Sequence, residues 1–578
     1  MINERRTATS LIFIVLGVII ALQLLSMFRS KRLYKRLNKT VATWTDAVSG
    51  VGRTRVAGHT TAGEYPGDEG DWLIWAMHAE PKTLSPISVD QDIYAKWITV
   101  GNIFEPLLNY DWDEISLVPL LAQSYEVSAD GLEITFHLRD DIYFSDGTPV
   151  TSDDVIFTYE TIINPEVDAA DVSNLYVDVA RAVKINDRIV KFYMKRPYFK
   201  ALEVVGFWDT GILPRHIYAF TDAARFNERV SNPAGSGPYL FEKWDVGSEV
   251  VLRRNENYWG PKPKLKKVIY KFIPNNIASL QALRSHQVDM MIPDMEQFAD
   301  LLADEEFRKE FTCVSYWNPG APFFYMGWNQ NTPFFSDRRV RLAMTHIVNR
   351  SQIVSKLLKG QAEIITGPFY VKGNQNDPDI KPRPYDLEKA KELLDEAGWI
   401  DTDGDGVRDK NGVPFKFNFM YSSQYIFYQR IAKLLKDEAA KVGVEVIPDP
   451  YEWSVVIGRL TDRKFEAMIM GWGGDIVEDV YQVFHSSQIE NRGSNYVAFR
   501  NDQADIIMEQ IRLSMDEIYR DRLSRQLHRI LHEEQPYTFL YARPTFRLVD
   551  KRFANTRVHR LGFNYFEWYV PKGLQKYN

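Results

Sequence analysis

The chain has 578 residues, which is longer than one ordinary domain, so two or three domains are expected. Hydrophobic residues make up 45% of it and charged residues 25%, as in a globular protein and unlike a disordered one. The net charge of −7 argues against nucleic acid as the main partner. The many Trp, Tyr and Phe residues favour a large aromatic-lined interior or cleft.

The N-terminus contains a candidate membrane segment. Residues 11–28 are uncharged and almost wholly apolar, and their number is about what a bilayer-spanning helix needs. Arg5 and Arg6 precede them, as in a signal sequence, but no convincing small-x-small cleavage site follows. We therefore predict a short segment over residues 1–10 and an uncleaved anchor over residues 11–28, with a cleaved leader as the alternative. Residues 29–70 are predicted to form a basic and flexible tether.

The basic residues at the start of this tether outnumber the charges before the span. By the positive-inside rule alone they place the body of the chain in the cytoplasm. Cys313 is the only cysteine, which excludes an internal disulfide, a cysteine-based metal cluster and a lipid-bearing Cys after the leader. The sequence has no P-loop, no G-x-S-x-G and no dinucleotide fingerprint, so neither a cofactor nor a catalytic residue is predicted.

In the first half, residues 71–78 are predicted to form a strand. Residues 132–138 alternate strictly between apolar and polar, which predicts a half-buried strand after the turn at Asp130-Gly131. Residues 151–154 read Thr-Ser-Asp-Asp, which is typical of a helix start.

In the second half, apolar residues at helical spacing predict helices over residues 336–349, 351–360, 387–397 and 430–442. Strands such as residues 443–447 alternate with these helices. This alternation predicts an α/β lobe.

Four long motifs occur in one order along the chain. They are LAQSYEVSADGLEITFHLRDDIYFSDGTPVTSDDVIFTYE (residues 121–160), GSGPYLFEKW followed by NENYWG, WNQNTPFFSDRRVRLAMTHIVNR (residues 328–350) and YDLEKAKELLDEAGW (residues 385–399). Together they resemble the family 5 extracellular solute-binding proteins, which include the peptide-, dipeptide- and nickel-binding components of ABC importers. The resemblance extends from about residue 71 to the end of the chain.

The resemblance implies an α/β, two-lobed, periplasmic-binding-protein-like fold of type II that closes like a hinge around its ligand. Lobe one is expected to comprise residues 71–316 with residues 542–578, and to carry an extra subdomain inserted at about residues 111–221. Lobe two is expected to comprise residues 317–541.

The resemblance also implies the function. We expect the extracytoplasmic substrate-binding component of an ABC importer, tethered by its N-terminal helix, which captures peptides and delivers them to permease subunits in the membrane. It would be a monomer and not an enzyme, with no nucleic-acid partner. Two alternatives stay open. One is a membrane-anchored secreted hydrolase using carboxylates such as Asp475, Glu478 and Asp479, and the other is a tethered sensor that binds a non-peptide solute on the same fold.

The stretch over residues 464–486 holds the candidate binding site. Its apolar run ends at Gly471, and Trp472 and Asp475 then stand at the carboxyl end of the predicted strand, where open α/β folds bind ligands. Gly473 and Gly474 let the backbone approach another group closely. A carboxylate beside a Trp suits a small cationic group. The alternative is a plain turn in which Asp475 caps the next helix.

Resemblance gives these residues roles. Residues 471–475 match a Gly-Trp-x-x-Asp element whose Asp pairs with the α-amino group of a peptide, so Asp475 inherits that role. Trp453 matches a Trp that lines a side-chain pocket. Some relatives have an Arg for the ligand carboxylate, but residues 468–470 and 421–423, where it would fall, contain none. A longer peptide, or a cationic ligand that is not a peptide, therefore stays open.

Two motifs could hold metal ions. Residues 401–409 place oxygen ligands at the spacing of a calcium loop, although Gly412 stands where the usual bidentate Glu is expected. Both structural calcium and a solvated turn stay open there. His528 and His532 lie four apart without the H-E-x-x-H order, and a partly buried structural helix is favoured over a metal site. No metal site is predicted.

Overall fold

The computed structural model describes residues 53–56, 65–207, 209–490 and 493–577. The predicted anchor over residues 11–28, together with residues 1–10 and most of the tether, lies outside these ranges. Among the helices that the structure does describe, none combines the length and the apolar character needed to cross a bilayer.

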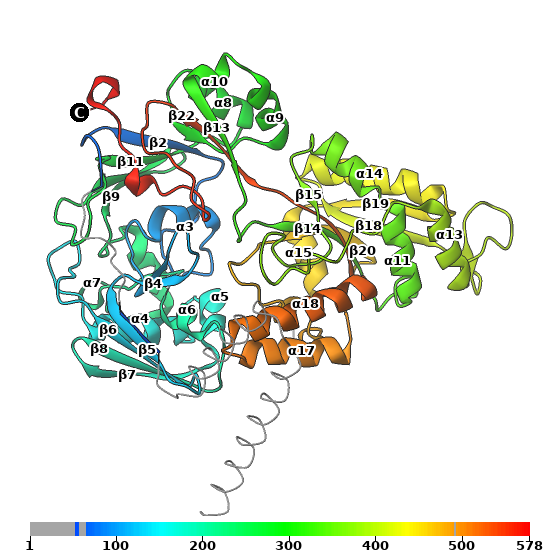
Figure 1. Cartoon of the computed structure of the whole chain (residues 1–578), viewed down its shortest axis with the longest axis horizontal. Coiled ribbons are helices and arrows are strands. Elements are labelled where there is room, and N and C mark those ends of the chain that lie inside the picture. Colours follow the sequence, from blue (N-terminus) through cyan, green and yellow to red (C-terminus); the bar gives the residue numbers. More distant parts are fainter. Residues whose placement is uncertain (1–52, 57–64, 208, 491–492, 578) are drawn as a thin grey trace, which may run out of the picture. The chain divides into compact units, whose positions relative to one another are not determined.

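Three larger sheets organise the described chain (Figure 1). The first, in spatial order, is β15 (Glu363–Ile364), β21 (Tyr537–Ala542), β14 (Phe323–Trp328), β20 (Ala467–Trp472), β18 (Lys416–Ser422) and β19 (Glu445–Tyr451). The second is β13 (Phe311–Tyr316), β22 (Thr545–Asp550), β12 (Met290–Met291), β2 (Trp72–Met77), β11 (Lys267–Phe272), β10 (Glu249–Arg254) and β9 (Tyr239–Asp245). The third is β1 (Arg53–Val56), β5 (Ala122–Val127), β6 (Glu133–Leu138), β8 (Ile189–Met194) and β7 (Val179–Asn186). Two small hairpins are β3 (Leu108–Tyr110) with β4 (Leu117–Pro119), and β16 (Asp409–Lys410) with β17 (Val413–Pro414).

The α-helices fall between these strands in the sequence. In the first half they are α3 (Ile93–Thr99), α4 (Ser152–Ile163), α5 (Ala170–Ser173), α6 (Ala201–Val205), α7 (Arg215–Tyr218), α8 (Asn276–Arg284), α9 (Met295–Ala303) and α10 (Phe307–Glu310). In the second half they are α11 (Arg338–Ile347), α12 (Arg350–Gln352), α13 (Leu387–Glu396), α14 (Ile426–Ala440), α15 (Trp453–Thr461), α16 (Tyr481–Phe484), α17 (Asp502–Leu513) and α18 (Glu517–Glu534).

Both faces of the six-stranded sheet are covered, because successive residues of its strands enter different hydrophobic clusters. Along β20, Ile469 belongs to the cluster that includes α11, α13 and α14, whereas Met468 and Met470 belong to the cluster that includes α15, α17 and α18. A strand buried on both faces is apolar at every position rather than at alternate ones. This burial explains the continuous apolar run that the sequence shows before Gly471.

Two connections join the six-stranded and seven-stranded sheets within the described chain. Residues 317–322 lead from β13 to β14, and residues 543–544 lead from β21 back to β22. Figure 1 shows the second connection as an extended red-orange segment that runs between the two groups of strands. The predicted limits of the two lobes, residues 71–316 with 542–578 and residues 317–541, stay a prediction about which parts move together.

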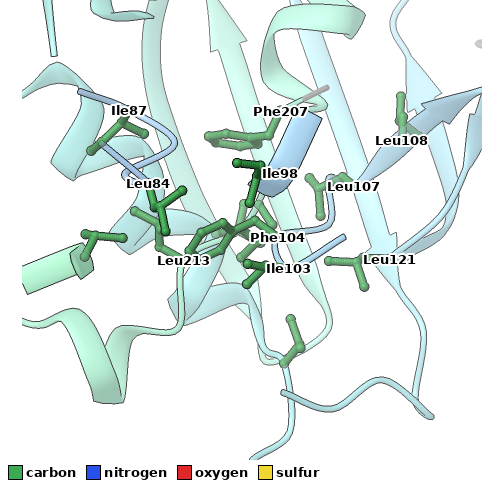
Figure 2. Packing of buried hydrophobic residues seen from close by; sticks show 14 of the residues in the cluster. Leu84, Ile87, Ile98, Ile103, Phe104, Leu107, Leu108, Leu121, Phe207 and Leu213 are labelled. Carbon is green, nitrogen blue, oxygen red and sulfur yellow. The ribbon is translucent and has the colours of Figure 1, made fainter. Parts of the chain in front are cut away.

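The region around α3 is built on a dense apolar cluster. Figure 2 shows Ile98 of α3 meeting Phe104 and Phe207, with Leu84, Leu107 and neighbouring leucines and isoleucines around them. Phe104 is completely buried and Phe207 almost so. This core holds α3 in place through Ile98.

Most predicted elements are present, and the differences lie mainly at their ends. The start predicted at residues 151–154 is the beginning of α4, where Thr151 and Asp154 form a capping box. The helix predicted from residue 430 is α14, which begins four residues earlier at Ile426. The helix predicted over residues 351–360 is instead the short α12 followed by a π-helical turn, Ile353–Leu357.

Candidate functional site

The carboxyl ends of four strands meet at one edge of the six-stranded sheet. Strands β18, β19 and β20 are parallel to one another. Strand β21 runs in the same direction, because β20 and β21 are both antiparallel to β14, which lies between them. Tyr425 follows β18, Trp453 follows β19, Asp475 follows β20 and Arg543 follows β21. Ligands of open α/β sheets bind at such an edge.

Trp472 is the last residue of β20 and is partly buried. Its ring stacks on Tyr496, with centroids 5.7 Å apart and planes 10° from parallel. Its indole N–H donates a hydrogen bond to the hydroxyl of Tyr537 at 3.4 Å. The predicted strand was expected to stop at Gly471, but Gly471 pairs with Phe324 of β14 inside the ladder. The strand therefore delivers Trp472 directly to the sheet edge.

The two glycines after Trp472 differ in their surroundings. A Cβ on Gly474 would lie 2.4 Å from the carbonyl oxygen of Ala321, which belongs to the connection between β13 and β14. The close approach predicted for these glycines is thus a backbone contact with that connection. Gly473, in contrast, has no atom within 4 Å of its added Cβ position, so it leaves space open beside Trp472.

Asp475 forms an ion pair with Lys200, which immediately precedes α6. The Asp475 side chain is 40% exposed, whereas that of Lys200 is 11% exposed. The sequence contains no sign of this pairing, which is seen only in the structure. The alternative of a helix cap is wrong, because the next helix, α16, begins at Tyr481 with Val480 at its cap position. The Asp475 carboxylate instead accepts the N–H of Ile476.

Further carboxyl groups surround this ion pair. Glu203 lies 3.7 Å from the Lys200 ammonium, and Glu478 accepts the backbone N–H of Asp475 at 2.7 Å. Burial raises the pKa of Glu478 to about 8, and the negative charge of Asp475 adds to the effect. Burial also raises the pKa of Glu203 above its usual range. Three carboxyl groups thus lie around one ammonium, and the raised pKa of Glu478 favours its protonated, neutral form near pH 7.

Asp479 is neutralised separately. Its carboxylate lies 3.0 Å from the Arg512 guanidinium and accepts the Tyr198 hydroxyl at 3.0 Å. The same guanidinium lies over the rings of Tyr198 and Tyr481. Of the three carboxylates named for a hydrolase, Asp475 therefore pairs with Lys200, Asp479 pairs with Arg512, and Glu478 accepts the backbone N–H of Asp475.

Trp453 is the first residue of α15, and Glu452 caps this helix through the N–H of Ser454 at 2.9 Å. The ring of Trp453 is 37% exposed and meets the edge of Tyr425, with centroids 6.3 Å apart and planes at 87°. Tyr425 is itself half exposed and lies close enough to Tyr94 of α3 for its charge to raise the pKa of that hydroxyl, after the larger effect of burial. Aromatic side chains from α3 thus approach those at the sheet edge.

The structure brings together Asp475, Trp472, Gly473 and Gly474, which are consecutive, and places Trp453 at the same edge but two strands away. Sequence reasoning missed Lys200, which is 275 positions away from its partner and belongs to no motif. It also missed Arg543. A charged residue directly after a strand end is the same signal that identified Asp475, so Arg543 could have been found.

The residues of the two candidate metal motifs make hydrogen bonds within the protein. Asp401, Asp403 and Asp405 come within 4.8 Å of one another and are exposed, but their oxygens accept backbone N–H groups of the same turn. His528 is completely buried, with Thr366 at 3.0 Å from one ring nitrogen and the N–H of Asp377 at 3.1 Å from the other. With both of its nitrogens engaged, His528 has none left for a metal.

Comparisons with known proteins identify the family of the chain. Residues 116–495 match the family described as bacterial extracellular solute-binding proteins, family 5 Middle. The oligopeptide-binding protein AppA of Bacillus subtilis (strain 168) is 29% identical over 550 residues, covering 92% of this chain and 97% of AppA. The dipeptide-binding protein of Escherichia coli (strain K12) is 25% identical over 522 residues, covering 86% of this chain and 94% of that one.

Solved structures show the same fold. AppA from Bacillus subtilis in complex with a nonapeptide has a TM-score of 0.74 at 28% identity, covering 88% of this chain and 100% of that one. NikZ from Campylobacter jejuni in complex with Ni(L-His) has a TM-score of 0.72 at 26% identity, covering 86% and 99%. The predicted α/β, type II periplasmic-binding-protein-like fold is therefore confirmed. The fold and the sequence match agree, and the chain belongs to family 5 of the bacterial extracellular solute-binding proteins.

Proposed function

We propose that this protein captures peptides outside the cytoplasmic membrane and delivers them to the permease subunits of an ABC importer. One observation carries the proposal: Trp472, Asp475 and Trp453 stand at the carboxyl ends of parallel strands, where such sheets bind ligands. The surplus of carboxyl groups around Lys200 favours a ligand with a positive group. Relatives named as oligopeptide- and dipeptide-binding proteins support a peptide, whose α-ammonium is such a group.

In this proposal Asp475, Trp472, Gly473, Gly474 and Trp453 form the ligand site. The ligand ammonium takes over from Lys200 as the partner of Asp475, or joins it between Asp475 and Glu478. Either arrangement leaves no buried carboxylate without a cation, which would be unfavourable. The rings of Trp472 and Trp453 contact the apolar body of the peptide, and the open space beside Gly473 admits its backbone.

Capture then proceeds by closure rather than by covalent chemistry. Lobe one (residues 71–316 with 542–578) and lobe two (residues 317–541) would rotate about the two connections at residues 317–322 and 543–544, as hinge-bending binding proteins do. Water leaves the site on closure, which strengthens the pairing between Asp475 and the ammonium. The protein would act as a monomer and would not hydrolyse its ligand.

Residues 11–28 would tether the protein on the outer side of the membrane. The apolar length of this segment and the lack of a cleavage site after it support an anchor. In spheroplasts, external protease should digest the body of the protein. Protection of the body until the membrane is broken would contradict the orientation, and a mature N-terminus beyond residue 28 would contradict the anchor.

Ligand identification tests the proposal directly. The full-length protein, purified without added peptide, is denatured, and the released small molecules are analysed by mass spectrometry. We expect short peptides, and we expect those same peptides to raise the melting temperature of ligand-free protein in proportion to occupancy. A non-peptide solute would favour a sensor or another importer, and steady hydrolysis of an added peptide by pure protein would favour the hydrolase.

A further inference from the structure

Arg543 occupies a position at the sheet edge equivalent to that of Asp475. It directly follows β21, as Asp475 follows the β20 segment, and the two strands point the same way with only β14 between them. Neighbouring strands are about 4.8 Å apart, so the two strand ends are separated by roughly 10 Å. A carboxylate and a guanidinium therefore follow two strand ends at the same edge of the sheet, with one strand between them.

Arg543 lacks an anionic partner in the structure. Within the described ranges, neither a hydrogen bond nor an ion pair is found for its guanidinium. Two arginines that are buried are satisfied: Arg552 pairs with Asp71 and Asp289, and Arg350 donates to the carbonyls of Phe539 and Arg383. Arg543 is only partly buried, so its five N–H donors remain available to solvent or to a ligand.

A second cation lies nearby. Arg547 is only 8% exposed and donates to the carbonyl of Phe546 at 2.9 Å, while its guanidinium lies over the rings of Trp75 and Trp97. Burial lowers the pKa of Arg543 below its usual range, and the charge of Arg547 lowers it further. Two positive charges therefore lie near each other close to the end of β21.

The surroundings can hold a guanidinium but cannot neutralise it. Tyr541 and Tyr428 lie close to Arg543, but burial raises the pKa of each hydroxyl above its usual range, so both are neutral near pH 7 and supply no negative charge. Aromatic rings stabilise a cation only in part. A guanidinium presents a planar fork of donors that matches the two oxygens of a carboxylate.

We propose that Arg543, supported by the nearby charge of Arg547, binds a carboxylate group of the captured solute. The inference rests on the proposed function, because it places this subsite beside Asp475 on the same sheet edge. The carboxylate comes either from the C-terminus of a peptide or from an acidic side chain. Arg543 would take the place of the anion-binding Arg that is missing at residues 468–470 and 421–423.

Binding and stability together test the subsite. The full-length wild type, Arg543→Met and Arg543→Lys are each dialysed against a defined mixture of peptides of two to nine residues, and retained peptides are quantified by mass spectrometry. Every peptide is present with a free C-terminus, as its C-terminal amide, and as an amide with one internal Asp. Arg430→Met is the matched control, because Arg430 is exposed on α14 and its loss changes the net charge equally.

We expect wild type and Arg430→Met to retain carboxylate-bearing peptides on the order of 10- to 100-fold better than plain amides, the effect of one hydrogen bond between charged groups. Arg543→Met should lose this preference and still bind amides, and Arg543→Lys should keep part of it. A preference for free C-termini or for the internal Asp identifies the source of the carboxylate. Equal retention of all three forms by wild type overturns the subsite alone, whereas retention of none overturns the proposed function as well.

Stability separates a binding role from a structural one. A cation that lacks an anionic partner in the ligand-free protein does not stabilise it, so Arg543→Met should melt at the same temperature as wild type or higher. The carboxylate-bearing peptides should raise the melting temperature of wild type but not that of Arg543→Met. A large drop in the melting temperature of ligand-free Arg543→Met would make Arg543 structural and overturn the inference.

Discussion

Lys200 and Asp475 form an ion pair although 275 positions separate them in the chain. Lys200 precedes α6, which follows the five-stranded sheet, and Asp475 follows β20 of the six-stranded sheet. The pair therefore links two sheets at the candidate ligand site. Glu203 and Glu478 flank it, so any change in the charge of the site alters a group of four titratable side chains at once.

Asp475→Asn tests the recognition of an ammonium. The substitution keeps the size of the side chain but removes its charge, so we expect binding of peptides with a free N-terminus to weaken by about 2–5 kcal/mol. Binding of N-acetylated peptides should hardly change. Calorimetric titration of both peptide forms measures the difference. Equal affinity of wild type for the two forms would mean that the ligand is not held by its amine.

Lys200→Met tests whether Lys200 competes with the ligand ammonium for Asp475 or holds Asp475 in position for the ligand. If Lys200 occupies the place of the ligand ammonium, its removal should strengthen binding of free peptides about tenfold, or 1.4 kcal/mol. If Lys200 instead holds Asp475 in position for the ligand, the same substitution should weaken binding. The titration used for Asp475→Asn decides between the two arrangements, and an unchanged affinity would exclude both.

Arg552 anchors the seven-stranded sheet through a buried ion network. Its guanidinium lies 2.5 Å from Asp71 and 2.8 Å from Asp289, and all three side chains are at most 5% exposed. Arg552→Met leaves two buried carboxylates without a cation, so the free energy of unfolding should fall by about 3–5 kcal/mol. Arg225→Met is the control, because the Arg225–Glu228 pair is exposed to water and its loss should hardly change stability. Urea denaturation measures both, and similar losses would contradict the prediction.

His528 should make the protein sensitive to acid. Burial lowers the pKa of this ring from 6.5 to about 4, so the unfolded chain binds more protons than the folded one between these values. Stability is therefore complete above pH 6.5 and is lost as the pH falls toward 4. Between pH 7 and pH 5 the loss attributable to His528 is about 2 kcal/mol.

His528→Gln should remove that part of the pH dependence. The variant is expected to be less stable than wild type at pH 7, because the bonds to Thr366 and Asp377 are disturbed. The difference between the two proteins should shrink by about 2 kcal/mol from pH 7 to pH 5. Denaturation curves at both pH values provide the measurement. A difference that stays constant would mean that His528 titrates normally in the folded protein.

Trp328 of β14 and Trp453 at the start of α15 should respond differently to truncation. Trp328 is completely buried and donates its indole N–H to Thr538 at 3.0 Å, so Trp328→Ala should cost about 3–5 kcal/mol of stability. Trp453 is 37% exposed at the sheet edge, so Trp453→Ala should change stability by at most about 1 kcal/mol and should weaken ligand binding instead. Thermal melts and titrations of both variants, compared side by side, would expose the reverse pattern if it exists.

Much of the local structure could be predicted because it depends on neighbouring residues. The capping box of Thr151 and Asp154 begins α4, and Asp386 caps α13 as predicted. The apolar run before Trp472 is a buried strand, and the charged and aromatic residues after it lie at the sheet edge. Such features need only the spacing of side chains along a few turns or a few strand residues.

The amino-acid sequence by itself therefore determined the α/β class, the family motifs and the candidate position of Asp475. Only the tertiary structure decided what Asp475 and Arg543 meet. Periodicity and capping act over at most about 20 residues, whereas the ion pair with Lys200 forms because separate sheets pack together. The direction of β21 relative to β20 likewise depends on both pairing with β14. Strand pairing across long stretches of chain leaves no local pattern, so the sequence can show that Arg543 follows a strand but not that this strand ends at the same edge as β20.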